Sequence, residues 1–270
     1  MAFAGNSLLC RLALRQTAID AASFTLIRII AGAVALQLIV AARQKPRGKA
    51  GSWPSALALF VYAAGFSFAY LSLPAGTGAL LLFGAVQATM IIWALRQGEG
   101  LRAAQSVGLA LALAGLVALV FPGLSAPPLA GSLLMLSAGV AWGIYSLRGK
   151  AAGDAVSATA GNFLRAVPMA VGLSAVLLPW ARLDRTGIGY AILSGAIASG
   201  AGYAIWYTVL PALRGATAAT VQLSVPVLAA AGGILFLGET LTLRIVLASV
   251  AVLGGIALVA MGRRRVKDEG

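Results

Sequence analysis

Long apolar stretches, separated by short polar breaks, run along the whole chain. Nine of them hold about 17–24 residues, enough for a helix to cross about 30 Å of hydrocarbon. They are continuously apolar rather than alternating, and barrel strands are only about 10 residues long, so helices are favoured over strands. The pattern predicts an all-α integral membrane protein with ten transmembrane helices, at residues 3–14, 21–42, 55–73, 76–95, 106–122, 129–147, 158–178, 187–210, 216–237 and 241–261.

The first stretch, residues 3–14, is shorter than the others. As it stands it is too short to cross a bilayer, and it looks like the second half of a span. No basic segment precedes it, so it does not fit a cleavable signal peptide. We expect either a start upstream or a truncated first helix.

The composition agrees with a lipid environment. The chain is 60% hydrophobic and 10% charged, with a mean hydropathy of +0.95. A soluble domain of 270 residues needs more charge than this to cover its surface. With no histidine and a single cysteine, Cys10, the chain offers no histidine-based metal site or general base. We therefore expect no metal, no cofactor and no catalytic residue.

The net charge of +13 is compatible with nucleic-acid binding, but its placement indicates a membrane protein. Basic residues lie in short runs between apolar blocks, thirteen on one side of the predicted spans and five on the other. We expect the lipid bilayer, and no nucleic acid, as partner, with the richer side and both termini cytoplasmic in a bacterial-type inner membrane. The richer side holds Arg43, Lys45, Arg47, Lys49, Arg96, Arg102, Arg148, Lys150, Arg214, Arg263, Arg264, Arg265 and Lys267; the other holds Arg11, Arg15, Arg182, Arg185 and Arg244.

The chain contains an internal repeat. Four residues of the first half recur 137 positions later and four more recur 140 positions later, a constancy that is not easily accidental. Each half has five spans, an odd number, so the second half must enter the membrane from the opposite side, as in the inverted repeats of transporters. We expect a first repeat at 1–122, a second at 129–261 and a basic cytoplasmic tail at 262–270. The matches are Arg11, Arg28, Tyr70 and Pro74 with Arg148, Arg165, Tyr207 and Pro211, and Thr77, Gly98, Glu99 and Gly115 with Thr217, Gly238, Glu239 and Gly255.

Arg28 and Arg165 are charges inside apolar spans, each about seven residues, or roughly 10 Å, from its helix start. Such an arginine either attracts an anion or acts as a gate. Alternatively, it snorkels to the interface or caps carbonyl groups of a neighbouring helix. No aspartate or glutamate falls inside a predicted span, so a buried carboxylate proton relay is not supported.

Two further features lie at or between the later spans. Pro226, in the middle of the ninth span, indicates either a broken helix that lines a substrate cavity or a packing kink. The pairs Gly98-Glu99 and Gly238-Glu239 occupy short turns. Each glycine suits the end of one helix, and each glutamate is expected to face the positive end of the next helix.

Polar and aromatic side chains inside the spans are the candidates for binding a solute. Amides supply hydrogen bonds and aromatic rings supply stacking walls for a small organic molecule. For a single tryptophan or tyrosine, the alternative is a position in the interfacial aromatic belt. The candidates are Asn6, Ser7, Tyr70, Gln87, Trp142, Tyr145, Tyr203, Trp206, Tyr207 and Gln222.

Several motifs resemble those of the drug/metabolite transporter superfamily, in its EamA-domain branch. Ser23-Phe24-Thr25-Leu26-Ile27-Arg28 is similar to the arginine motif of the second helix, and Ala141-Trp142-Gly143-Ile144-Tyr145 to the Trp-Gly motif at the start of a repeat. Leu237-Gly238-Glu239-Thr240-Leu241-Thr242 with Gly254-Gly255 resembles the end of a repeat, and Gln97-Gly98-Glu99 with Gln105, Gly108 and Gly115 is its first-half counterpart. In the first half, Ala4-Gly5-Asn6 replaces the Trp-Gly motif.

The resemblance implies ten helices in two inverted five-helix repeats around a central cavity, and export of small metabolites. On that basis the expected substrate-binding residues are Asn6, Gln87, Trp142, Tyr145, Trp206 and Gln222, with Arg28, Arg165 and Pro226 in structural or gating roles.

The function predicted is that of a secondary transporter, not an enzyme, which exports a small organic metabolite such as an amino acid or a drug-like solute by alternating access. One alternative is an anion or phosphorylated-metabolite exchanger that uses Arg28 and Arg165. Another is a membrane-embedded lipid-modifying enzyme, for which the chain lacks a recognisable set of nucleophile, base and metal ligands. The oligomeric state stays open.

Overall fold

The structure, a computed structural model, describes residues 1–43, 50–98, 100–123, 126–149, 153–209 and 215–262, and over these residues it is helical without strands. Helices α8, η2 and α9 follow one another without a gap, so apart from the short 3₁₀ helix the described residues make ten helices, the number predicted. The elements are α1 (Ala2–Gln16), α2 (Ala21–Ala42), α3 (Trp53–Ala69), α4 (Ala75–Arg96), α5 (Ala103–Val120), α6 (Leu129–Gly149), α7 (Ala155–Val176), the short 3₁₀ helix η1 (Leu178–Trp180), α8 (Arg185–Ile192), the π-helix η2 (Leu193–Ala201), α9 (Gly202–Val209), α10 (Gly215–Leu237) and α11 (Leu243–Gly262).

The outer surface of the bundle is apolar. Large hydrophobic side chains such as Leu38, Val117, Ile205 and Phe236 stand exposed on four different helices. In water, apolar surface on this scale is unfavourable, whereas hydrocarbon tails solvate it well. Six helical segments of the described chain are long and apolar enough to cross a membrane, at Ala21–Ala42, Ala75–Arg96, Ala103–Val120, Leu129–Gly149, Arg185–Val209 and Leu243–Ala260.

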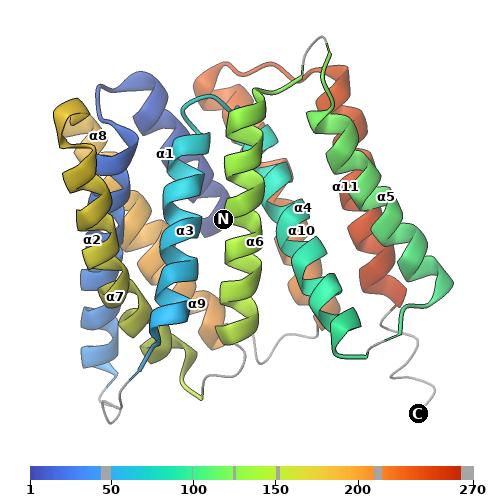
Figure 1. Ribbon diagram of the computed structural model, residues 1–270, viewed down its shortest axis with the longest axis horizontal. Coiled ribbons are helices and arrows are strands. Elements are labelled where there is room, and N and C mark those ends of the chain that lie inside the picture. The colour runs from blue at the N-terminus through green and yellow to red at the C-terminus, as the bar shows by residue number, and fades with distance from the viewer. Residues whose placement is uncertain (44–49, 99, 124–125, 150–152, 210–214, 263–270) are drawn as a thin grey trace.

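Successive spans run in opposite directions through the bundle (Figure 1). At one side α5 packs along α11, and at the other α2 packs against α7, α8 and η2. Helices α1, α3, α4, α6, α9 and α10 lie between these two groups, and α6 contacts both α3 and α4. The first turn of α1 lies midway between the two ends of the bundle (Figure 1).

Glycines bring neighbouring helices into close contact at two places that matter for this arrangement. Gly108 of α5 and Gly255 of α11 face each other, and a methyl group on either would overlap the backbone of the other. Gly195 of η2 packs directly against the backbone carbonyl of Arg28 on α2. Small residues allow such approach in membrane helices, and here they pack the π-helix closely against α2.

Aspartate side chains cap the N-termini of several helices. The Asp20 carboxylate accepts hydrogen bonds from the backbone N–H groups of Ala22 and Ser23 at the start of α2, and from that of Arg182. Partial burial raises the pKa of Asp20, but these hydrogen bonds outweigh it and hold the pKa below its ordinary value. Asp154 and Asp184 cap α7 and α8 in the same way.

Candidate functional site

A charged side chain lies in the interior of the bundle. Arg28, in the second turn of α2, is 2% exposed, and its guanidinium lies over the rings of Phe66 and Tyr62, with Cζ 4.8 and 5.3 Å from their centroids. It does not reach the interface by snorkelling, because its guanidinium is buried against Tyr62 and Phe66 of α3. Arg28 Nη2 donates a hydrogen bond to the Tyr62 hydroxyl at 3.1 Å.

The Tyr62 hydroxyl joins three helical segments around this arginine. It also accepts a hydrogen bond from Asn6 Nδ2 at 3.2 Å, and the Tyr203 hydroxyl lies 3.5 Å from it. Asn6 Oδ1 in turn accepts a hydrogen bond from the hydroxyl of Ser194 in η2. A π-helix is wider than an α-helix and often marks functional positions, and here it carries one of the groups that hold Asn6.

Aromatic rings surround the polar groups. Trp142 of α6 lies 4.7 Å from Tyr62, 5.0 Å from Tyr203 and 5.3 Å from Tyr145, measured between ring centroids, and stacks on Tyr145. Such ring pairs add stabilisation beyond the area they bury. The Tyr145 hydroxyl bonds to Thr159 of α7. The central cluster, as we define it, consists of Asn6, Arg28, Tyr62, Phe66, Trp142, Tyr145 and Tyr203.

Phe3 and Trp206 flank the central cluster. The Phe3 ring lies 5.8 Å from those of Tyr203 and Trp206, and 6.3 Å from those of Trp142 and Phe83. Both Phe3 and Trp206 are partly exposed, unlike the fully buried rings behind them. They therefore form the less buried side of this aromatic group.

The two predicted glutamines contact each other. Gln87 Nε2 of α4 donates a hydrogen bond to Gln222 Oε1 of α10 at 3.4 Å, and both side chains are partly exposed. Gln87 lies one turn beyond Phe83, so it shares the helix face that meets Phe3. Helix α10 continues through Pro226 without a break, but proline has no N–H, so the Gln222 carbonyl lacks its usual helical donor.

Arg165, the repeat partner of Arg28, lies in a different environment. Its Nη1 donates to the backbone carbonyl of Ala50 at 2.8 Å and to that of Gly161 at 3.0 Å. The side chain is partly exposed and caps carbonyl groups, which is one of the two alternatives considered for it. Arg28 and Arg165 therefore do not meet in one anion site through these contacts.

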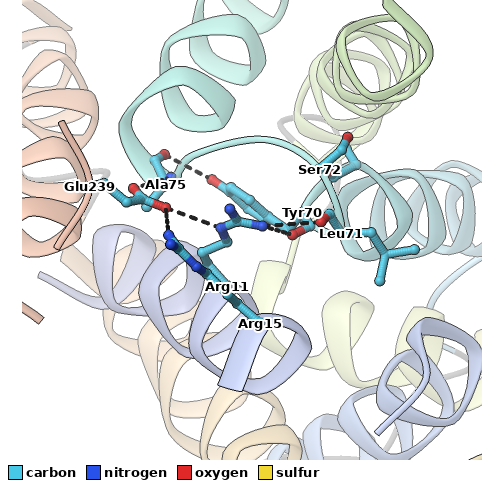
Figure 2. A network of polar contacts seen from close by, with 8 residues as sticks. Arg11, Arg15, Tyr70, Leu71, Ser72, Ala75 and Glu239 are labelled. Carbon is cyan, nitrogen blue, oxygen red and sulfur yellow. Dashed lines mark hydrogen bonds and ion pairs between the residues drawn. The ribbon is translucent and has the colours of Figure 1, made fainter. Parts of the chain in front are cut away.

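A second polar network lies at one end of the bundle (Figure 2). Arg11 Nε pairs with Glu239 Oε1 at 3.1 Å, and Arg11 Nη1 donates to the carbonyl groups of Tyr70 and Leu71. Arg15 adds a longer contact of 3.8 Å to the same Glu239 oxygen, and Glu239 Oε2 accepts the backbone N–H of Ala75 at 2.8 Å. This Glu239 network ties the turn between α10 and α11 to α1 and to the start of α4.

The expectation for Glu239 is therefore wrong in one respect. Its carboxylate faces the positive end of α4 in the other half of the chain, whereas α11, the next helix, begins only at Leu243. Sequence proximity alone indicates the next helix, α11, as the partner of Glu239, but in the fold the start of α4 lies beside its carboxylate. The corresponding expectation for Glu99 lies outside the described residues.

Sequence reasoning missed Tyr62, Phe66 and the partner role of Arg11. One signal was available, because Tyr62, Phe66 and Tyr70 recur every four residues and so share one face of α3. The contact of Arg11 with Glu239 spans 228 positions and carries no comparable local signal.

Known proteins resemble this chain at three levels. The sequence model of the EamA-like transporter family matches residues 129–261. The uncharacterized protein PA1977 of Pseudomonas aeruginosa is 55% identical over 264 residues, which cover 97% of this chain and 92% of that protein. The threonine/homoserine exporter RhtA of Salmonella typhimurium is 35% identical over 132 residues, 46% of this chain and 43% of the exporter. A crystal structure described only as that of a protein superposes with a TM-score of 0.67 over 98% of this chain and 97% of its own, and at 20% identity it supports the fold alone.

Proposed function

Because this chain belongs to the EamA-like transporter family, we propose that it is a secondary transporter that exports a small organic metabolite by alternating access. The family and the apolar helices make it a multi-pass integral membrane protein, and they favour transport of small molecules over enzymatic activity. The observation that carries the proposal is the central cluster, a charged and aromatic group buried in the middle of an apolar bundle. Such groups in membranes are costly and are kept where they bind or move a solute.

The proposed substrate-binding residues are Asn6, Trp142, Tyr145, Trp206, Gln87 and Gln222, with Arg28, Arg165 and Pro226 supporting the site or the gates. Asn6, Trp142 and Tyr145 belong to the central cluster, and Trp206 reaches it through Phe3. Gln87 and Gln222 form a polar contact on the neighbouring helices α4 and α10.

Support for two inverted repeats, 1–122 and 129–261, comes from the pattern of helix contacts. In the two halves, α1 corresponds to α6, α3 to the span that contains η2, and α4 to α10. Under this correspondence, the contact of α3 with α6 matches that of η2 with α1, and the contact of α4 with α6 matches that of α10 with α1. The pairs α5–α11, α2–α7 and α4–α10 map onto themselves. A two-fold axis in the membrane plane produces this symmetry, and the halves can then rock against each other around a fixed site.

The Glu239 network holds the two halves together at one end, and its bonds would break and re-form as the halves rock. It joins α1 and α4 of the first half to the α10–α11 turn of the second half. The charge bias favours this end outside the cytoplasm and the C-terminal end of α11 inside, in a bacterial-type inner membrane, whereas the N-terminus lies within the bundle (Figure 1). In the proposed cycle, the conformation described here has the outer end held shut by Glu239 and its partners.

Counterflow into proteoliposomes tests the proposal. Purified protein is reconstituted, loaded with unlabelled solute and offered a labelled trace of the same solute, across amino acids, nucleosides, polyamines and sugar phosphates. We expect saturable accumulation of at least one class, absent from empty liposomes. Hydrolysis of vesicle lipid without solute movement would favour the lipid-modifying enzyme instead.

The Gln222→Leu variant separates binding from packing at the glutamine pair. If Gln222 binds solute, transport falls while the melting temperature holds. If it serves only Gln87, stability falls first, because the partly buried Gln87 amide loses its hydrogen-bond acceptor.

A further inference from the structure

The charge of Arg28 has no acidic partner among the described residues. The ion pairs there join Arg11 and Arg15 to Glu239, and Arg43 to Asp154. No aspartate or glutamate lies within any of the described helices. A guanidinium in a low-dielectric interior is costly unless a counter-charge or several hydrogen bonds compensate it.

The hydrogen bonds of Arg28 leave one end of its guanidinium free. Nη2 donates to Tyr62, whereas the buried Nη1 atom has no hydrogen-bond partner within the described part of the chain. The side chain is nonetheless held in place, since its Cζ lies over the rings of Phe66 and Tyr62. A fixed guanidinium with an unused donor is suited to bind a planar carboxylate.

We propose that Arg28 binds the carboxylate of the exported solute, and that the substrates are therefore small organic monocarboxylates, amino acids among them. The inference rests on the proposed transport function and assigns the polar end of its site. Tyr62 and Asn6 position the guanidinium, and the rings of Trp142 and Tyr203 contact the rest of the solute.

The positive charge in the central cluster favours binding of a monoanion over binding of a phosphate ester. Arg165 is occupied by the carbonyl groups of Ala50 and Gly161, and Arg11 by Glu239. Arg28 is thus the one cation that the central cluster contributes, as defined from the described residues. A dianionic phosphate needs more positive charge than one guanidinium supplies, whereas a carboxylate matches it.

Matched solute pairs test the assignment. Counterflow is measured for L-phenylalanine against phenethylamine and for L-threonine against threoninol, where the second member lacks the carboxylate, with glucose 6-phosphate as the phosphate probe. We expect kcat/KM to favour the carboxylate by roughly 10- to 100-fold, the range of a charge-assisted hydrogen bond. Arg28→Gln should abolish this preference, and Arg28→Lys should keep part of it.

Arg165→Gln is the matched control, because it removes the other arginine within a span. It should alter the rates of both members of a pair alike. Melting temperatures establish that each variant is folded, and if Arg28→Gln does not fold, the wild-type ratio and Arg28→Lys decide.

The outcomes separate the two proposals. Equal transport of phenethylamine or threoninol, a preference for glucose 6-phosphate, or an unchanged preference in folded Arg28→Gln would overturn the carboxylate assignment and leave the transporter standing. Failure to move any solute of this or the broader panel would overturn the proposed function, and the carboxylate subsite with it.

Discussion

Disruption of the Glu239 network should destabilise the protein, and most of the loss should come from the interaction between Arg11 and Glu239. The side chains of Arg11 and Glu239 are only 10% and 7% exposed, and the Nε–Oε1 distance is 3.1 Å. Removing one partner of a fully buried pair costs about 3–5 kcal/mol. Glu239→Gln should cost less, about 2–3 kcal/mol, since Arg11 keeps the carbonyl groups of Tyr70 and Leu71 and charged hydrogen bonds contribute about 1.5–3 kcal/mol.

A double-mutant cycle isolates the pair. Free energies of unfolding are measured in mixed micelles for the wild type, Arg11→Met, Glu239→Gln and the double variant. We expect a coupling energy of about 2 kcal/mol, since contacting charged residues typically couple by 0.5–3 kcal/mol. The control cycle uses Arg43 and Asp154, which are 3.8 Å apart with side chains 29% and 36% exposed. Solvent screening should keep that coupling below about 1 kcal/mol.

Additive effects at Arg11 and Glu239, with coupling below about 0.5 kcal/mol, would refute the reasoning. So would equal coupling in the two cycles, because burial is the stated cause of the difference.

Three other predictions concern the cluster, a helix cap and the topology. Tyr62→Phe keeps the ring contacts but removes the acceptor of three buried donors, and should lower the free energy of unfolding by about 1–3 kcal/mol; an unchanged value would mean that the hydroxyl is dispensable. Asp20→Ala should cost about 1 kcal/mol near pH 7. Because the folded state lowers the pKa of Asp20, this difference should persist above about pH 4 and vanish as the pH falls further, and a pH-independent difference would contradict the cap. In a Cys10→Ser background, an impermeant thiol reagent should label Ser72→Cys from outside intact cells but not Gln97→Cys; the reverse pattern would invert the topology.

Sequence predicted the helices well because lipid imposes a simple rule. A span must satisfy its backbone hydrogen bonds internally, so each long apolar run becomes one helix, and its ends follow from the flanking polar residues. Asp20 and Asp154 show this, since each lies directly before the helix that it caps. The span from 185 to 209 was also found, although its middle turned out to be a π-helix, a local change that hydropathy does not report.

The candidate site was harder to predict, because its contacts join distant parts of the chain. The distance of Arg28 from the helix start left open whether its side chain reaches the interface. Its burial and its contacts with Tyr62 and Phe66 of α3 show that it points into the bundle. Trp142 and Tyr145 were identified as candidates inside a span. For Tyr62, the four-residue spacing with Phe66 and Tyr70 indicates a shared helix face, but it does not indicate that the hydroxyl links Asn6 to Arg28.

The central claim is that the exported solute binds at the central cluster, and the Trp142→Leu variant tests it most directly. Counterflow of the best solute and the rise in melting temperature that this solute causes are measured side by side for wild type and variant in the same lipid. Loss of the stacked ring should remove both signals while the protein stays folded. A well-folded Trp142→Leu protein with wild-type transport kinetics and wild-type thermal stabilisation by solute would contradict the account.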